Sequence, residues 1–173
     1  MQLHPRLLVV GAACALALTL TPTSAFAHDD DGHGDDGGKG DLLRSGLVGS
    51  TRSADGGADI FTVKPGGAPW VVDEGTVRVR RDGRLDVRIE GLVIPTPPQN
   101  GTNPVAAVTA TLYCNAKAAA VTKPFPLSRP EGDGRIRADL MLPITCVAPV
   151  VLLNPVNADF PNGNPGTYIA ATG

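Results

Sequence analysis

Short apolar runs separated by Gly, Pro, Asn and Asp recur along the chain from residue 42 to its end. No ten-residue segment has the periodicity of an amphipathic helix, because Pro or Gly interrupts every candidate. The pattern therefore predicts short β-strands, each with one apolar face. Trp70, the only tryptophan, is expected to fill the core between them. In addition to the strands argued below, the expected strands are 46–51, 60–63, 70–72, 147–153 and 167–171.

Residues 76–89 contain a β-hairpin whose register follows from the alternation of apolar and charged residues. A two-residue turn would place Asp86 opposite Val79 and put a charge on the apolar face. A three-residue loop places Leu85 opposite Val79 instead, and gives Gly83 the left-handed conformation that this loop type requires. Because the apolar face determines register, we predict the three-residue loop. The resulting cross-strand pairs are Val79–Leu85, Val77–Val87 and Arg78–Asp86.

Two of the three cysteines, Cys114 and Cys146, lie in the β-rich part of the chain. Side chains at every second position of a strand point to the same face of the sheet. In segments 108–114 and 136–146 each cysteine falls on the same alternate positions as the apolar residues, so both cysteines are expected to face the core. This holds if each segment is one unbroken strand, and Pro143 is the residue that could interrupt the second. The two cysteines lack the C-x-x-C spacing and the basic neighbours of a reactive dithiol. The sequence therefore predicts one structural disulfide.

Together these elements predict an all-β fold, an antiparallel β-sandwich that is immunoglobulin-like in broad layout. Segments 95–104 and 154–166 are too rich in Pro and Asn for central strands, and are expected as loops at the ends of the sandwich. Such loops commonly bind ligands, although Asn and Gly are also ordinary turn residues. The candidate ligand contacts are Gln99, Asn100, Asn154, Asn157, Asp159, Asn162 and Asn164.

Residues 1–27 have the three-part layout of a secretory signal peptide. Arg6 supplies a positive charge, an apolar run over 7–20 follows, and Ala25 and Ala27 provide small residues for cleavage. The apolar run is shorter than a membrane-spanning helix requires. Cys14 could instead carry a lipid, but no large aliphatic residue stands in the three positions before it. The sequence predicts a protein that is secreted or held at the cell surface, and its Arg- and Ala-rich composition hints at a bacterial source.

Residues 28–41 carry six aspartates and one lysine, and no large apolar side chain. This composition predicts a disordered acidic tail in front of a domain at 42–173. A solvated spacer is one interpretation of the tail, and weak capture of a divalent metal is the other, because imidazoles and carboxylates bind such ions. The candidate metal ligands are His28, Asp29, Asp30, Asp31, His33, Asp35 and Asp36. No other cofactor is expected.

The predicted domain at 42–173 contains no histidine, which argues against Ser-His-Asp, Cys-His and catalytic zinc chemistry. Its carboxylates leave a carboxylate-based hydrolase as a third hypothesis, although solvated surface charge is the simpler interpretation. These carboxylates include Asp73, Glu74, Glu90, Glu131, Asp133, Asp139 and Asp159.

The same domain carries 13 basic and 11 acidic residues, without an evident basic cluster interleaved with aromatic residues. This balance argues against a nucleic-acid partner. The leading prediction is a non-catalytic binding or structural module at or outside the cell envelope, whose ligand the sequence does not identify. An exported divalent-metal-binding protein, using the tail, is the alternative.

Overall fold

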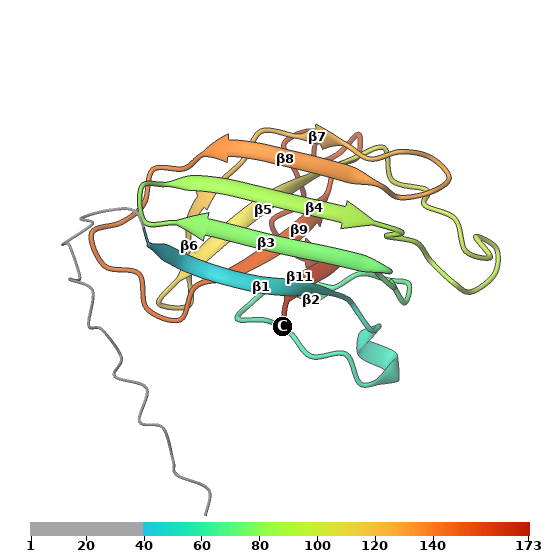
Figure 1. Ribbon diagram of the computed structural model, residues 1–173. Coiled ribbons are helices and arrows are strands. Elements are labelled where there is room, and N and C mark those ends of the chain that lie inside the picture. Colours follow the sequence, from blue (N-terminus) through green and yellow to red (C-terminus); the bar gives the residue numbers. More distant parts are fainter. Residues whose placement is uncertain (1–39) are drawn as a thin grey trace, which may run out of the picture. The chain divides into compact units, whose positions relative to one another are not determined.

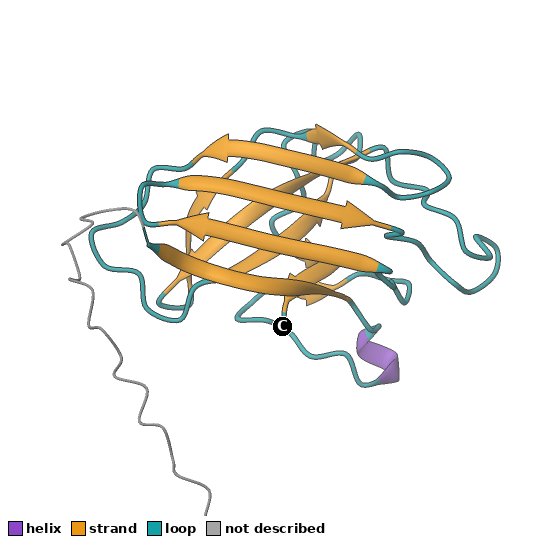
Figure 2. Cartoon of the chain, in the orientation of Figure 1, coloured by secondary structure: helices purple, strands orange, loops and turns teal. Residues whose placement is uncertain are grey.

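The computed structural model describes residues 40–173, which form an antiparallel β-sandwich of two facing layers (Figures 1 and 2). The front sheet has the strand order β1 (Asp41–Gly49), β3 (Glu74–Arg80), β4 (Arg84–Glu90) and β8 (Gly134–Asp139). The back sheet has the order β11 (Ala170–Thr172), β9 (Val150–Pro155), β5 (Ala107–Cys114) and β6 (Lys117–Val121), and β7 (Phe125–Pro126) also pairs with β5. The predicted sandwich, immunoglobulin-like only in this two-layer layout, is confirmed.

Strand β1 belongs to both sheets. Its first part pairs with β3, and Leu47 to Gly49 pair with β11, so the two layers form one sheet that curls around the core. A short parallel pair, β2 (Lys64–Pro65) and β10 (Thr167–Tyr168), and a single 3-10 turn at Ser53–Asp55 complete the described chain. Within this described region no helix has the length and apolar character to cross a membrane.

The predicted hairpin is confirmed in both register and loop length. Val79 pairs with Leu85, and Gly83 has a positive φ of 92°. A side chain at Gly83 would meet the backbone of Leu140, whose amide donates a hydrogen bond to the Gly83 carbonyl. The hairpin turn therefore requires glycine both for its backbone conformation and for this close approach.

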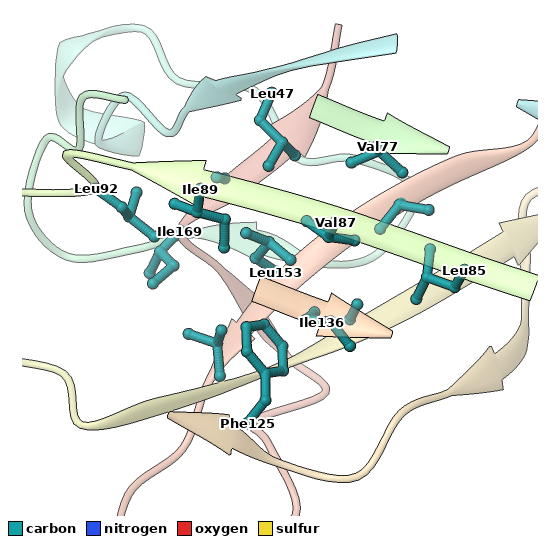
Figure 3. Packing of buried hydrophobic residues seen from close by; sticks show 14 of the residues in the cluster. Leu47, Val77, Leu85, Val87, Ile89, Leu92, Phe125, Ile136, Leu153 and Ile169 are labelled. Carbon is teal, nitrogen blue, oxygen red and sulfur yellow. The ribbon is translucent and has the colours of Figure 1, made fainter. Parts of the chain in front are cut away.

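The main core lies between the sheets, where one face of each strand meets the other layer (Figure 3). Val87 and Ile136 from the front sheet and Leu153 from the back sheet are almost fully buried there. Trp70 is buried in the same cluster, as the sequence predicts. Cys114 forms the predicted disulfide with Cys146, which joins the end of β5 to the loop that follows β8.

A second, smaller core covers the outer face of the back sheet. Tyr113 of β5 and Leu152 of β9 pack there against Val63, Tyr168 and Ala171. The Tyr168 hydroxyl also donates a 2.8 Å hydrogen bond to the Ala58 carbonyl. Every residue of β5 after the first is buried, so this strand is covered on both faces. The expectation that each strand has only one buried face is therefore wrong for β5.

Burial also changes the acidity of the two tyrosines in this second core. It raises the pKa of the Tyr113 hydroxyl above its ordinary value. Burial likewise raises the pKa of Tyr168, and the negative charge of Asp59 raises it further. Both hydroxyls therefore favour the neutral form that a covered apolar site requires.

Several predicted strand boundaries are wrong. The segment 136–146 is a strand only to Asp139, and the loop beyond it leaves Ile144 fully exposed although its parity predicted burial. The next strand starts at Val150 rather than at 147. Segments 60–63 and 70–72 contribute only isolated bridges, and β6 and β7 were not predicted. Prolines and the disulfide hold the 140–149 connection as a loop, which parity alone does not reveal.

Candidate functional site: an arginine-rich outer face

The outer face of the front sheet is lined with arginine. On β3, β4 and β8 the side chains alternate, so that apolar residues enter the core and charged residues point to solvent. Strand order then places these outward residues side by side, together with one arginine from β1. The seven arginines that line this surface, called the arginine face below, are Arg44, Arg78, Arg80, Arg84, Arg88, Arg135 and Arg137.

Some of these arginines stand directly opposite one another on neighbouring strands. Arg44 on β1 is in register with Arg78 on β3, and Arg88 on β4 is in register with Arg135 on β8. Directly opposed like charges destabilise a sheet. The fold therefore tolerates two unfavourable pairs on this one face.

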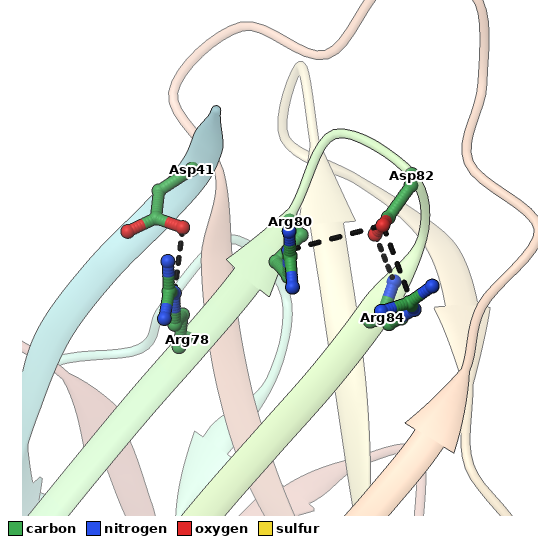
Figure 4. A network of polar contacts seen from close by, with 5 residues as sticks. All are labelled: Asp41, Arg78, Arg80, Asp82 and Arg84. Atoms are coloured by element: carbon green, nitrogen blue, oxygen red, sulfur yellow. Dashed lines mark hydrogen bonds and ion pairs between the residues drawn. The ribbon is translucent and has the colours of Figure 1, made fainter. Parts of the chain in front are cut away.

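Carboxylates compensate part of this positive charge (Figure 4). Asp41 Oδ1 accepts a 2.7 Å hydrogen bond from Arg78 Nε. Asp82 Oδ2 lies 3.8 Å from Arg80 Nε and 3.5 Å from Arg84 Nε. Within residues 40–173, no salt bridge involves Arg44 or Arg88. These two arginines therefore have no carboxylate partner in the described part of the chain.

Asp86 is held between two arginines at the centre of the face. Its Oδ2 accepts hydrogen bonds of 3.2 Å from Arg135 Nη2 and from Arg137 Nε. Partial desolvation raises the pKa of Asp86, but the hydrogen bonds and charges of the two arginines outweigh it and lower this pKa below its ordinary value. The lowered pKa favours the ionised carboxylate of Asp86, which is the form that accepts both hydrogen bonds.

The arginine face forms an open concavity of about 730 Å³. Its lining carries the seven arginines and three carboxylates, Glu74, Asp86 and Asp139, which gives a formal charge of +4. Guanidinium groups bind the oxygens of phosphate, sulfate or carboxylate in pairs. The lining includes no histidine, cysteine or aromatic residue. Its chemistry is therefore that of an anion-binding surface.

The two predicted binding loops lie at one end of the sandwich, because Val108 at the start of β5 pairs with Pro155 at the end of β9. Asn154, however, is buried: its Oδ1 accepts a hydrogen bond from Thr111 Oγ1, and its Nδ2 donates one to the Thr167 carbonyl. Asn154 therefore stabilises the back sheet and is not available at the surface.

Several other candidate loop residues form turns. The Oδ1 atoms of Asn157 and Asn164 accept hydrogen bonds from nearby backbone amides, those of Phe160 and Gly166. Asn100 has a positive φ of 47° and donates from Nδ2 to the Pro98 carbonyl. The remaining candidates are the exposed Asp159 and Asn162 and the partly buried Gln99. Turn formation thus accounts for the polar groups of Asn100, Asn157 and Asn164.

The candidate carboxylates are mostly dispersed. Glu74 and Glu90 are in register at the open end of the hairpin, and Asp133 Oδ1 accepts a hydrogen bond from the Gly91 amide. Residues 40–173 contain no group of three His, Cys, Asp or Glu side chains arranged to hold a metal. The seven candidate metal ligands of the tail, and the predicted signal peptide, lie outside the described residues.

The arginine face was not predicted from the sequence, although a signal was present. Arg78, Arg80, Arg84 and Arg88 occupy the outward positions of the predicted hairpin. Arg135 and Arg137 have the outward parity of their own strand. Only the strand order places β8 next to β4, and thereby joins these separate stripes into one surface. Comparison of the chain with protein-family models, curated proteins and solved structures finds no match.

Proposed function

We propose that this protein is a non-catalytic binding module that holds a linear anionic polymer, rich in phosphate or sulfate groups, on its arginine face. The observation that carries the proposal is the arrangement of opposed arginines, Arg44 with Arg78 and Arg88 with Arg135. Such pairs are unfavourable in the free protein, and a bound polyanion relieves their repulsion. The disulfide between Cys114 and Cys146 supports a site of action outside the cytoplasm, at or beyond the cell envelope.

The shape of the face supports an extended ligand. Its arginines come from four adjacent strands, which lie about 4.8 Å apart, and alternate residues along one strand are separated by about 6.8 Å. A polymer with closely spaced oxyanions can contact several guanidinium groups at once. Each contact releases a counterion, so binding is expected to weaken steeply with salt.

The test is binding of the purified protein to long-chain inorganic polyphosphate and to dextran sulfate, with uncharged dextran as the reference. The variant Arg44→Thr/Arg88→Thr removes the two arginines that have no carboxylate partner among the described residues. We expect its affinity for polyphosphate to fall by roughly tenfold and the slope of log affinity against log salt to become shallower. The matched control is Lys117→Thr/Lys123→Thr, which removes two exposed charges from β6 and the chain after it.

An affinity loss in the lysine control as large as that in the arginine variant would contradict the proposal, because net charge alone would then determine binding. Single-stranded DNA separates a second class of partner. The lining has no aromatic residue on which a base could stack. We therefore expect the DNA to bind no more tightly than polyphosphate, and markedly tighter binding of DNA would overturn the proposed ligand class.

A further inference from the structure

Two small side chains interrupt the arginine face near its centre. Thr76 of β3 is exposed on this face, and Gly46 of β1 stands directly opposite it. Both residues line the concavity. Threonine is short and glycine has no side chain, whereas the side chain of arginine extends much farther from the sheet. The surface over Thr76 and Gly46, called the Thr76 gap below, is therefore lower than the arginines around it.

Three arginines surround the Thr76 gap. Arg88 of β4 stands directly opposite Thr76 on the side away from β1. Arg78 follows Thr76 by two residues along β3, and Arg44 of β1 stands opposite Arg78. Diagonal neighbours in an antiparallel sheet lie about 7–8 Å apart, which is within reach of long side chains. The three guanidinium groups can therefore contact one small anion that lies over Thr76.

Two of these three arginines have no carboxylate partner among the described residues. Arg78 is paired with Asp41, whose Oδ1 lies 2.7 Å from its Nε (Figure 4). No salt bridge within residues 40–173 involves Arg44 or Arg88. Two positive charges beside the gap are thus left uncompensated in this part of the chain, which suits an anion of charge −2.

Carboxylates bound the Thr76 gap on the side away from Arg78. Glu74 precedes Thr76 by two residues on β3, and Glu90 stands opposite Glu74 on β4. Within residues 40–173, neither glutamate forms a salt bridge with an arginine. Their negative charge repels an anion. A bound anionic group is therefore favoured over Thr76 and disfavoured farther along the strands in this direction.

We propose that the Thr76 gap is a subsite for one phosphate group in its dianionic form, as presented by a phosphate monoester or by the end of a phosphate chain. Guanidinium groups on three sides suit a tetrahedral anion with three free oxygens, and the Thr76 hydroxyl adds a donor below it. A phosphate monoester carries close to two negative charges at neutral pH. A sulfate ester or a phosphodiester is a monoanion. The subsite rests on the function proposed above and deepens it, because it selects dianionic phosphate among the anions of the ligand.

The first measurement compares two probes of similar shape, phenyl phosphate and phenyl sulfate. Each is titrated into the purified protein at about pH 7 and about pH 5, on either side of the second ionisation of a phosphate monoester near pH 6. Arginine side-chain Nε–Hε signals are recorded by NMR. We expect the phosphate to bind roughly fivefold more tightly than the sulfate at the higher pH, and about equally at the lower pH.

The sulfate probe keeps its single charge at both pH values, so it reports any change in the protein itself. The charged groups that face the gap or its neighbours are Arg44, Arg78, Arg88, Arg135, Asp41, Glu74, Asp86 and Glu90. Both probes experience these groups alike. Equal affinities of the two probes at about pH 7, or absence of binding by both, would overturn the subsite.

The same titration locates the bound phosphate. The signals of Arg44, Arg78 and Arg88 should shift most when phenyl phosphate is added. Arg84, at the hairpin end of the face beside Asp82, should shift less. Arg52, outside the lining of the face, is the internal reference. Shifts at Arg84 as large as those at the three arginines would contradict a subsite over Thr76.

Variants at Thr76 test the gap directly. Thr76→Glu places a carboxylate among the three arginines and should lower the affinity for phenyl phosphate by at least about tenfold at about pH 7. The matched control Ala119→Glu adds the same charge on an exposed position of β6 and should change it by less than about twofold. Thr76→Val keeps the shape of the side chain without its hydroxyl, and should lower the affinity about threefold. An equal loss in Thr76→Glu and Ala119→Glu would overturn the subsite.

The two polymers of the preceding section separate failure of the subsite from failure of the proposed function. Binding of both polyphosphate and dextran sulfate, with equal affinities for the two phenyl probes, would support the function and contradict the subsite. Binding of phenyl phosphate that is weakened by Thr76→Glu, without binding of either polymer, would support the subsite and contradict the function.

Discussion

The two sheets of this sandwich share one core but treat their outer faces in opposite ways. The outer face of the back sheet is covered by β10, by β2 and by the residues just before β2. These segments bury Tyr113 and Leu152 in a second core. The outer face of the front sheet carries seven arginines and forms an open concavity. One sheet thus uses both faces for stability, whereas the other uses only its inner face.

The two outer faces also differ in how well their neighbouring side chains suit one another. On the covered face, tyrosine, leucine and alanine contact each other as an ordinary core requires. On the open face, Arg44 faces Arg78 and Arg88 faces Arg135, although threonine or glutamate at either position would remove the repulsion. An arrangement that is unfavourable for the free fold and suits an anionic ligand is typical of a binding surface.

The largest expected effect on stability comes from removing the disulfide that joins the two sheets at one end. The disulfide joins Cys114 of the back sheet to Cys146, 32 residues later, in the loop that follows β8 of the front sheet. The double variant Cys114→Ala/Cys146→Ala should lower the free energy of unfolding by about 3.7 kcal/mol, because the unfolded chain regains loop-closure entropy. Urea denaturation measures this change. A loss below about 1 kcal/mol would mean that the loop closure contributes little.

The next largest effect on stability is expected from a substitution in the second core, and it tests the difference between the two outer faces directly. Leu152 is fully buried on the covered face of the back sheet. The variant Leu152→Ala should lower the free energy of unfolding by about 3 kcal/mol, because it removes apolar contacts and leaves a cavity. Leu153→Ala, on the inner face of the same strand, is the matched control. If Leu152→Ala were nearly neutral while Leu153→Ala was not, the second core would contribute little and the comparison of the two sheets would fail.

The sequence predicts the parts of this fold that depend on the alternation of apolar and polar residues within one strand or hairpin. The hairpin register follows from valines and arginines at period two, and the cysteine pair follows from parity and the absence of a reactive motif. The second core is not predicted, because the outward residues of β5 include Thr109 and Thr111, which suit either water or burial. The arginine face depends on β8 lying beside β4, and no single-sequence pattern determines that neighbour.

A smaller effect should separate arginines that lack a carboxylate partner from those that have one. Arg88 stands opposite Arg135, whereas Arg137 lies 3.2 Å from Asp86 Oδ2. The variant Arg88→Thr should leave stability unchanged or raise it by up to about 0.5 kcal/mol, because it removes a repulsion. Arg137→Thr should instead lower stability by a few tenths of a kcal/mol, that is by roughly the value of an exposed ion pair. Thermal denaturation of the two variants at low salt compares them, and equal destabilisation by both would contradict the repulsion.

The smallest expected effect is the contribution of Asp86 to stability at acidic pH. Its folded-state pKa is lowered by Arg135 and Arg137 despite partial desolvation. A lowered pKa in the folded state means that the ionised carboxylate stabilises the fold above the unfolded-state pKa of 3.8. This contribution is lost as the pH falls through the folded-state value. The wild type should therefore be slightly more stable than Asp86→Asn at pH values above about 5, and this difference should disappear in strong acid.

Urea denaturation of both proteins between neutral and strongly acidic pH measures this difference, with Glu131→Gln, on an exposed loop, as the control for the loss of one carboxylate. A stability difference that stays constant down to strong acid would show that Asp86 acts through its shape rather than its charge. High salt should reduce the difference at neutral pH, because the ion pairs of this open face are exposed to solvent. The same salt should leave the effect of Leu152→Ala nearly unchanged, since the covered face of the back sheet is held by apolar contacts rather than by charge.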